Sequence, residues 1–163
     1  MPLSPGDRIP AVQLFHFTSD GPAPISSEAL FGSGTCVAFA LPGAFTPTCS
    51  QAHLPGYVVR SDALAAAGVD RIICLSVNDA FVMHAWGREH NADDRVLMVA
   101  DGNADFARAM GLDVDLSARG MGIRSQRYAM IVRDGTIEHL NVEAPGQFAV
   151  SDAQTMLGLL GAN

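Results

Sequence analysis

The sequence predicts an α/β fold in which a mixed central sheet has helices on both faces. Short apolar runs at residues 35–41, 71–77 and 95–100 alternate with segments of helical character, which is typical of parallel strands joined by helices. Farther along, the dipeptide Asp134-Gly135 separates two more apolar runs, which indicates a two-residue β-hairpin. Because the strands of a hairpin are antiparallel, the two observations together predict a sheet with both kinds of pairing.

The amino-terminal half is expected to contain a strand and a long helix. The amino terminus itself is rich in Pro, Gly and Ser, so we expect a loose layer there, with a short strand or hairpin near 11–17. The run 35–41 is almost wholly apolar and ends at a Pro-Gly pair, which indicates a buried strand. A helix is expected over 47–67, with a kink at Pro55 and with Gly68 at its carboxyl end.

Two further strands and two helices are expected between residues 71 and 110. The runs 71–77 and 95–100 indicate buried strands, because both are short and almost wholly apolar. Between them, Asn78 or Asp79 can cap a helix that extends to about residue 90. A short helix over 104–110 follows, with a glycine directly after it, as is common at helix ends.

The last third of the chain is expected to form a long loop, the hairpin and a final helix. Residues 112–126 have no clear period, and loops of that length are often functional. The hairpin strands are expected over 127–133 and 136–142. Ser151 and Gln154 have the spacing of a capping box, which predicts a helix to about residue 160. This order of elements fits a thioredoxin-like architecture, and it also fits other mixed α/β folds.

Length and composition restrict the class of protein. The chain has 163 residues, which matches one domain, so residues 1–163 are interpreted as a single unit. Hydrophobic residues make up 48% and charged residues 17%, which is a globular composition. The net charge of −7, from 10 basic and 17 acidic residues, argues against nucleic acid or an anionic membrane as the main partner.

The expected compartment is a reducing one. Three cysteines are an odd number, and they include no Cys-x-x-Cys motif, which is unlike a disulfide scaffold. The amino terminus lacks the pattern of a secretory signal, and the longest apolar run, 36–45, is interrupted by Pro42 and is too short to cross a bilayer. We therefore expect a cytoplasmic protein with free thiols.

One cysteine stands at the predicted start of a helix. The segment 42–50 reads PGAFTPTCS and lies between a buried strand and a helix, where α/β proteins place their chemistry. Thr46 suits the N-cap and Pro47 suits the first helical position, so Cys49 falls in the first turn. The positive end of the helix favours the thiolate, which is the nucleophile. A lone helical cysteine can equally be a packing residue, and its placement alone leaves both interpretations open.

The same segment resembles the peroxiredoxin motif Pro-x-x-x-Thr-x-x-Cys through Pro42, Thr46 and Cys49. Further agreeing segments are GDRIP near the amino end, HLPGY at 53–57, SVNDAFVMHAW at 76–86, GIRSQRYAMIVRDG at 122–135 and LNVEAPG at 140–146. The resemblance covers nearly the whole chain and is to the atypical subgroup, called type II in plants and class V in mammals. It implies a thioredoxin-like fold and a peroxidase that reduces hydrogen peroxide, organic hydroperoxides and, in many members, peroxynitrite, with no metal or organic cofactor.

The resemblance also implies a role for each matching residue. Cys49 would be the peroxidatic cysteine, Thr46 would hydrogen-bond the peroxide, and Pro42 would shield the site from water. The family's arginine precedes a late strand, where Arg127 matches it and Arg124 is a nearby competitor. Such an arginine can stabilise both the thiolate and the charge on the leaving oxygen. The Thr46 hydroxyl could also cap the Cys49 N–H, since it has one proton and two lone pairs.

Oxidation of the cysteine would give a sulfenic acid, which a thiol must reduce. Mammalian-type members use a resolving cysteine near the carboxyl terminus, and residues 147–160 contain none. Cys74 follows Cys49 at the spacing of the second cysteine of plant-type members. It lies in a predicted core strand, however, where a buried thiol packs well, and the same holds for Cys36. The expected reductant is therefore external: glutathione with glutaredoxin, or a thioredoxin.

The histidines allow a metal interpretation that the sequence does not favour. Cys49 and His53 have the i, i+4 spacing of a Cys–His pair or of two metal ligands. A metal would need two more ligands, and His84 and His90 lie on a different predicted helix. We expect no metal site, and we expect His53 to be a structural or interface residue.

A partner and a second function remain open at this point. The atypical subgroup forms homodimers through the end of the molecule near the active site, so the loop 112–126 and the helix start near 78–81 are candidates for that surface. A non-enzymatic alternative is a redox-regulated binding protein, in which oxidation of Cys49 alters a partner contact. Sustained peroxide turnover with a thiol separates the two, because a binding protein is oxidised once and stops.

Overall fold

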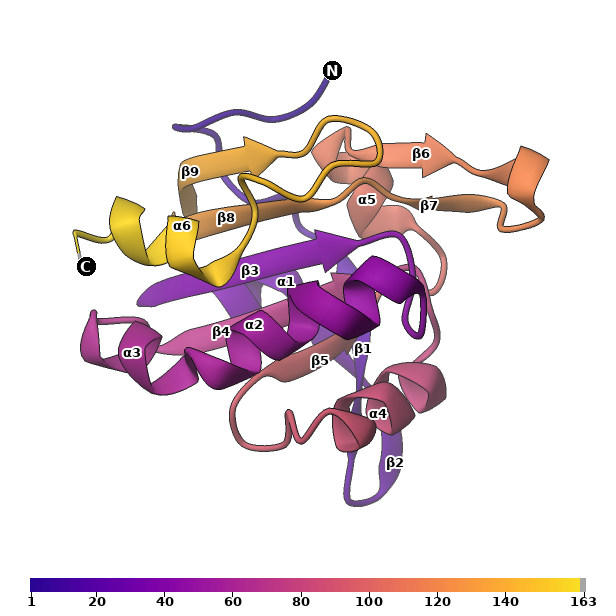
Figure 1. Ribbon diagram of the computed structural model, residues 1–163, viewed down its shortest axis with the longest axis horizontal. Coiled ribbons are helices and arrows are strands. Elements are labelled where there is room, and N and C mark those ends of the chain that lie inside the picture. Colours follow the sequence, from indigo (N-terminus) through magenta and orange to yellow (C-terminus); the bar gives the residue numbers. More distant parts are fainter. Residues whose placement is uncertain (162–163) are drawn as a thin grey trace.

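The centre of the molecule is a mixed sheet, which a computed structural model describes together with the rest of residues 1–161. Its strands are β1 (Gln13–Thr18), β2 (Gly21–Ser26), β3 (Thr35–Leu41), β4 (Arg71–Ser76), β5 (Leu97–Ala100), β8 (Tyr128–Arg133) and β9 (Thr136–Val142). Their order is β2-β1-β5-β4-β3-β8-β9 (Figure 1). β3, β4 and β5 are parallel, whereas β1 pairs antiparallel with β5 and β8 pairs antiparallel with β3. This is the predicted mixed sheet, and β8 and β9 form the predicted hairpin.

Helices cover both faces of this sheet, as the sequence predicts (Figure 1). They are α1 (Ser27–Phe31), α2 (Leu54–Val59), α3 (Ser61–Ala66), α4 (Ala80–Glu89), α5 (Asp105–Met110) and α6 (Ala153–Leu159). One core includes buried residues of α2, α3, α4 and α6, such as Tyr57 and Trp86. The other includes buried residues of α1 and α5, among them Phe31 and Phe106. Because β3 is buried on both faces, its sequence is continuously apolar rather than alternating.

The antiparallel pairing of β3 with β8 determines where distant residues meet. Ala40 lies opposite Tyr128, so the carboxyl end of β3 lies beside the amino end of β8. The chain leaves β3 toward Cys49, and Arg127 directly precedes β8. The topology therefore brings the predicted cysteine and the predicted arginine to the same end of the sheet.

The helix that carries Cys49 departs from the expected regular form. It begins at Pro47, as predicted, but η1 (Cys49–His53) is a π-helical turn in which the Leu54 N–H donates to the Cys49 carbonyl. Pro55 explains the wider turn, since proline has no N–H to donate and its ring clashes with the carbonyl four residues earlier. The helix thus widens ahead of Pro55. The expected end is confirmed, because Gly68 follows α3 with a φ of +98°.

Two expectations about loops are wrong. The segment 112–126 contains a two-stranded sheet of β6 (Asp113–Asp115) and β7 (Ile123–Ser125), joined through the 3-10 turn η2 (Ser117–Arg119). Strands of three residues are too short to show a period in the sequence. The short strand or hairpin expected near 11–17 is confirmed, because β1 and β2 pair as a hairpin. The expected loose layer is wrong, because this hairpin and α1 give the segment regular structure. Pairing of β1 with β5 incorporates that hairpin into the sheet.

The start of the last helix also differs from the prediction. Asp152, and not Ser151, caps α6 by accepting a hydrogen bond from the Thr155 N–H. The Ser151 hydroxyl instead donates to the Glu143 carboxylate over 2.7 Å. A tertiary contact therefore replaces the local one that the capping-box spacing predicts.

The outer strands limit further pairing at the edges of the sheet. β2 carries Pro22 and Pro24, which lie opposite Phe17 and Phe15 of β1. Proline is tolerated in a strand where its missing N–H faces away from the sheet. On the other side, the amino-terminal segment covers the start of β9, because Ile137 exchanges backbone hydrogen bonds with residues 6–7 over 2.8 and 2.9 Å.

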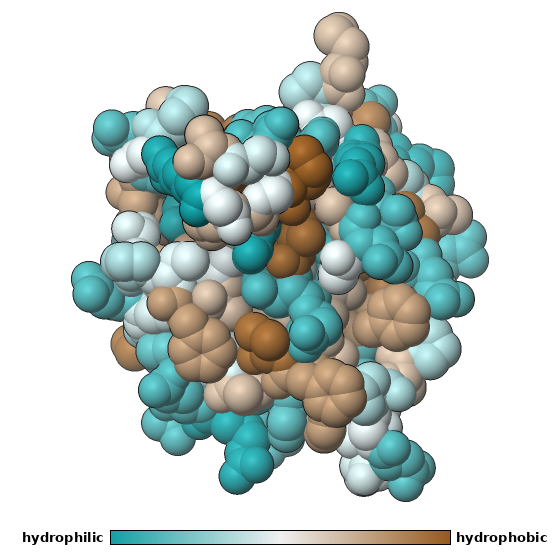
Figure 2. Space-filling view, turned by 90° about the vertical axis from the view of Figure 1, so that its right-hand side faces the viewer, coloured by the Kyte–Doolittle hydropathy of each residue, from teal (hydrophilic) through white to brown (hydrophobic). Residues whose placement is uncertain are grey.

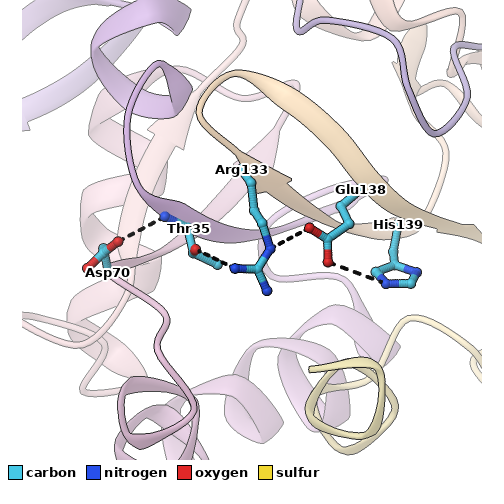
Figure 3. Close-up of polar contacts among 5 residues, drawn as sticks. All are labelled: Thr35, Asp70, Arg133, Glu138 and His139. Atoms are coloured by element: carbon cyan, nitrogen blue, oxygen red, sulfur yellow. Dashed lines mark hydrogen bonds and ion pairs between the residues drawn. The ribbon is translucent and has the colours of Figure 1, made fainter. Parts of the chain in front are cut away.

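The end of the sheet opposite Cys49 is cross-linked by polar side chains (Figure 3). The Asp70 carboxylate accepts from the Thr35 N–H over 2.8 Å, and the Thr35 hydroxyl accepts from Arg133 over 3.4 Å. Arg133 also pairs with Glu138, which lies 3.7 Å from His139. These contacts tie β4, β3, β8 and β9 together at one end.

Candidate active site

A tight turn leads from β3 into the helix of Cys49. Phe45 in this turn has a φ of +67°, a left-handed conformation that costs a residue with a side chain about 1–2 kcal/mol. Asn78 holds the turn from the neighbouring strand, because its side-chain oxygen accepts from the Ala44 N–H over 2.9 Å and from the Ser76 hydroxyl over 2.6 Å. Of the two residues expected to cap α4, Asp79 does so by accepting from the Val82 N–H. Asn78 is thus free to fix the turn.

The Cys49 sulfur is fully buried and accepts a hydrogen bond from Arg127. Nη2 of the guanidinium lies 3.1 Å from Sγ. The sulfur also lies in the first turns of its helix, where the partial charge is positive. A cationic donor and the positive end of a helix are the surroundings in which reactive cysteines are found.

His53 binds the other terminal nitrogen of the same guanidinium. Nη1 of Arg127 lies 2.8 Å from His53 Nδ1, and His53 Nε2 lies 3.1 Å from the Ser151 carbonyl. A guanidinium can only donate and a carbonyl can only accept, so His53 is neutral and carries its proton on Nε2. The pKa is consistent with this, because burial and then the Arg127 charge lower the pKa of His53 to about 3.

Of the two alternatives expected for His53, a structural or an interface residue, burial favours the structural one. His53 is not an interface residue, since its side chain is fully buried and its ring lies among the rings of Phe39, Tyr57 and Phe148, with centroids 4.9, 5.7 and 4.9 Å away. The i, i+4 spacing from Cys49 was the signal that pointed to it. The two side chains are connected through Arg127. The spacing between Cys49 and His53 alone could not predict this third residue.

The remaining predicted site residues lie in and around the turn. The Thr46 hydroxyl donates to the Gly43 carbonyl over 2.7 Å, and no bond from the Cys49 N–H to this hydroxyl is present within residues 1–161. Arg124 donates to the Pro42 carbonyl over 3.3 Å. Of the two candidate arginines, Arg127 therefore contacts the cysteine and Arg124 contacts the turn.

The other two cysteines are buried thiols. Cys74 is fully buried in the same apolar core as Cys49, and burial raises its pKa well above the ordinary value of a thiol. Cys36 packs in the core on the opposite face of the sheet, as expected, and burial raises its pKa as well. Neither thiol is readily ionised.

Residues 1–161 contain neither a candidate membrane span nor a candidate metal cluster. Within 1–161, no helix has the length and apolarity needed to span a membrane. In that part of the chain, no cluster of three or more His, Cys, Asp or Glu side chains is placed to hold a metal ion. A surface hollow of about 730 Å³ lies along α3, β4 and the segment before β5, and its lining contains neither Cys nor His. The buried group around Cys49 is the arrangement in which a cysteine, a cation and a histidine are in direct contact.

The chain is similar to known proteins over most of its length. The Redoxin family profile matches residues 4–157. The chain is 45% identical over 163 residues to Peroxiredoxin-2E-2, chloroplastic, of Oryza sativa subsp. japonica, covering 97% of this chain and 72% of the relative. The crystal structure of reduced Prx3 in complex with hydrogen peroxide from Vibrio vulnificus is similar with a TM-score of 0.93 and 51% identity, covering 97% of this chain and 99% of that one. Peroxiredoxin 5 from Alvinella pompejana gives a TM-score of 0.86 at 31% identity, covering 98% and 99%.

These similarities extend over nearly the whole chain and confirm the predicted thioredoxin-like fold. The chain belongs to the peroxiredoxins, within the Redoxin family, and is a thiol-dependent peroxidase of the atypical type.

Proposed function

We propose that Cys49 is the residue at which this peroxidase reduces hydrogen peroxide and organic hydroperoxides. The observation that carries the proposal is the position of Arg127, whose terminal nitrogens contact Cys49 Sγ at 3.1 Å and His53 Nδ1 at 2.8 Å. The similar Prx3 of Vibrio vulnificus has been crystallised with hydrogen peroxide, which supports the same class of substrate. The cysteine that the family resemblance assigns as peroxidatic thus has a guanidinium as its hydrogen-bond donor.

The first step forms an S–O bond and breaks the O–O bond of the peroxide. The Cys49 thiolate attacks the oxygen that carries the proton and gives up two electrons, which makes the sulfur a sulfenic acid. The other oxygen leaves as hydroxide or alkoxide and takes up a proton from solvent. Negative charge therefore moves from the sulfur to the leaving oxygen during the step.

Residues around the sulfur have distinct roles in this step. Arg127 stabilises the thiolate and then the charge on the leaving oxygen, and a donor fixed before reaction needs no reorganisation. The proton of the Thr46 hydroxyl is committed to Gly43, so Thr46 orients the peroxide as an acceptor through its remaining lone pairs. Pro42, half-buried directly after β3, has the role that the family resemblance implies for it, which is to limit the access of water.

The second step returns the sulfur to the thiol. One reductant thiol attacks the sulfenic acid, which forms a mixed disulfide on Cys49 and releases water. A second thiol then displaces Cys49 and leaves as a disulfide with the first. Because the Cys49 sulfur is fully buried, the helix around it must open before a thiol of any size can reach it.

The reductant we propose is external: glutathione with glutaredoxin, or a thioredoxin. The internal candidate, Cys74, remains a protonated thiol in the core, because burial raises its pKa. A disulfide between Cys49 and Cys74 would remove packing from the centre of β4. All three cysteines are free thiols, which supports a reducing compartment such as the cytoplasm.

The protein is also proposed to form a homodimer through the end that carries the active-site turn. Phe45 and Phe81 are 51% and 64% exposed, and Phe81 lies edge-on to Phe17, with ring centroids 5.9 Å apart. Figure 2 shows hydrophobic side chains among hydrophilic ones on this side of the molecule. Exposed aromatic side chains are typical anchors of protein–protein interfaces, and a second copy offers the same surface.

Cys49→Ser is expected to abolish turnover while the fold remains, because an alcohol is not ionised at neutral pH. The assay follows hydrogen peroxide and an alkyl hydroperoxide with glutathione plus glutaredoxin, and separately with thioredoxin plus its reductase. More than trace activity of the variant would contradict the assignment. If the wild-type protein is oxidised once and then stops with every reductant, the redox-regulated binding function is the better account.

Arg127→Lys is expected to slow oxidation of Cys49 about 10²- to 10³-fold, the effect typical of losing one preorganised donor. A single ammonium cannot contact both the sulfur and His53 as the guanidinium does. Rapid mixing with peroxide can follow the reaction through Trp86, the single tryptophan, which donates to Ser50 beside the cysteine. Arg124→Lys is the matched control and should change the rate much less. Equal losses in both variants would remove the special role of Arg127.

Cys74→Ser is expected to retain most of its turnover with glutathione and glutaredoxin. Both routes need the helix around Cys49 to open, but the internal disulfide also breaks the core packing around Cys74, which costs on the order of a further 2–5 kcal/mol, so an external thiol should react first. Mass spectrometry after peroxide and glutathione should show a mixed disulfide on Cys49. Cys36→Ser controls for the loss of a buried thiol. A Cys49–Cys74 disulfide as the main product, with lost activity in Cys74→Ser alone, would establish the two-cysteine route instead.

Light scattering at micromolar protein is expected to give a mass near twice 17.1 kDa. Phe81→Glu should shift the protein toward the monomer, because it buries a charge in the proposed interface. Val59→Glu, at an exposed apolar residue of α2, is the control and should leave the mass unchanged. A monomer at every concentration of the wild-type protein would exclude this surface.

A further inference from the structure

A buried carboxylate beyond the active site collects an unusual number of hydrogen bonds. Glu143 directly follows β9 and is only 7% exposed. Its oxygens accept from the N–H groups of Ala149, Val150 and Ser151 over 2.8–3.0 Å and from the Ser151 hydroxyl over 2.7 Å. Burial alone would raise the pKa of Glu143, but the bonds from Ser151 and its neighbours outweigh it and hold the pKa below the ordinary value. Glu143 is therefore ionised and closes the loop 144–151 onto itself.

This loop supplies one wall of the active site. The Ser151 carbonyl accepts from the Tyr57 hydroxyl over 2.7 Å and from His53 Nε2 over 3.1 Å. The Phe148 ring lies 4.9 Å from the His53 ring and 5.9 Å from the Arg127 guanidinium carbon. These interactions of the loop are thus with Tyr57, His53 and Arg127, and none of them is with Cys49.

The position of the Ser151 carbonyl decides how His53 can act. With that acceptor in place, the proton of His53 stays on Nε2 and the Nδ1 lone pair is free to accept from Arg127. If the carbonyl moves away, the proton can shift to Nδ1, or His53 can take up a second proton. In either case Nδ1 becomes a donor that faces the Arg127 N–H, so the hydrogen bond from the guanidinium to His53 is lost.

We propose that Glu143 is a positioning residue for the peroxidase reaction, which through the Ser151 carbonyl and His53 holds the Arg127 guanidinium on Cys49. The proposal rests on the proposed role of Cys49 and Arg127 and adds a residue that touches neither. Four contacts connect it to the sulfur: Glu143 to Ser151, the Ser151 carbonyl to His53, His53 to Arg127, and Arg127 to Cys49.

The chemistry of the cluster requires a carboxylate in particular. One oxygen of Glu143 accepts from four donors, and the second oxygen also accepts from the Ala149 N–H. Glutamine has the same shape, but it would place an NH₂ group against the Ala149 N–H, and it lacks the charge that strengthens these bonds. Glu143→Gln therefore weakens the closure of the loop while changing its volume very little.

The test compares Glu143→Gln with Glu138→Gln. Glu138 lies on β9 in the same hairpin and loses an ion pair with Arg133 when changed (Figure 3), but its contacts do not lead to His53. Oxidation by hydrogen peroxide, followed through Trp86, should be about 10- to 100-fold slower in Glu143→Gln, as expected for a misplaced catalytic group. Glu138→Gln should react as the wild type does. Urea denaturation shows that both variants are folded under the assay conditions.

A second readout separates positioning from a purely structural role. Nitrogen NMR of His53 should show a neutral ring protonated on Nε2 in the wild type down to about pH 5, since its pKa is about 3, and a mixed or doubly protonated ring in Glu143→Gln. The charged and titratable groups that face His53 are Cys49 and Tyr57 from its own helical segment, Arg127 before β8 and Glu143 after β9. The rate ratio of Glu143→Gln to wild type should accordingly fall further between about pH 7.5 and pH 5.

The oxidation rate and the His53 signals of Glu143→Gln together decide whether Glu143 positions Arg127. If Glu143→Gln is less stable but keeps the wild-type oxidation rate and His53 signals, Glu143 is structural only and the proposal is wrong. If that variant does not fold, Ser151→Ala, which removes only the hydroxyl bond to Glu143, should show the same two changes at smaller size, and no change overturns the proposal. If the wild type has no peroxidase activity, the proposed function fails, while the NMR signals still decide whether Glu143 fixes His53.

Discussion

The Arg127 guanidinium joins two parts of the chain that folding must bring together. Its terminal nitrogens contact Cys49 and His53 on one helical segment, and its backbone directly precedes β8. The contact forms only if β3 and β8 pair in the observed register, since that register places the start of β8 beside the end of β3. The sheet, the turn after β3 and the widened helix all serve to hold one cation against one sulfur.

The π-helical turn contributes to this geometry in a way that a regular helix could not. Cys49 and His53 begin and end the wider turn, and both side chains face the same guanidinium. Pro55 forces the widening, because a regular helix would clash at its ring. Pro55 thus shapes the site although it has no chemical role there and lies after both Cys49 and His53 in the sequence.

The parts of this architecture that the sequence predicts are those with local causes. The run of β3 is apolar throughout because both of its faces are buried, and Pro47 begins a helix because its fixed φ suits that position. Arg127 was found through the family resemblance. By contrast, the role of His53 depends on Arg127 and on the Ser151 carbonyl, 74 and 98 residues away in sequence. No local period or spacing encodes such contacts. The capping-box prediction at Ser151 fails for the same reason, because the Ser151 hydroxyl donates to Glu143, which lies outside the local motif.

The two prolines of β2 have a consequence for how the molecule can aggregate. Pro22 and Pro24 leave the outer edge of β2 with carbonyl acceptors but without two of the N–H donors that a further strand would need. Edge strands that keep both kinds of group are templates for uncontrolled growth of sheets between molecules. A peroxidase works where oxidants damage and partly unfold proteins, so an edge that cannot be extended is an advantage there. Pairing of two molecules through their backbones is therefore disfavoured at that edge.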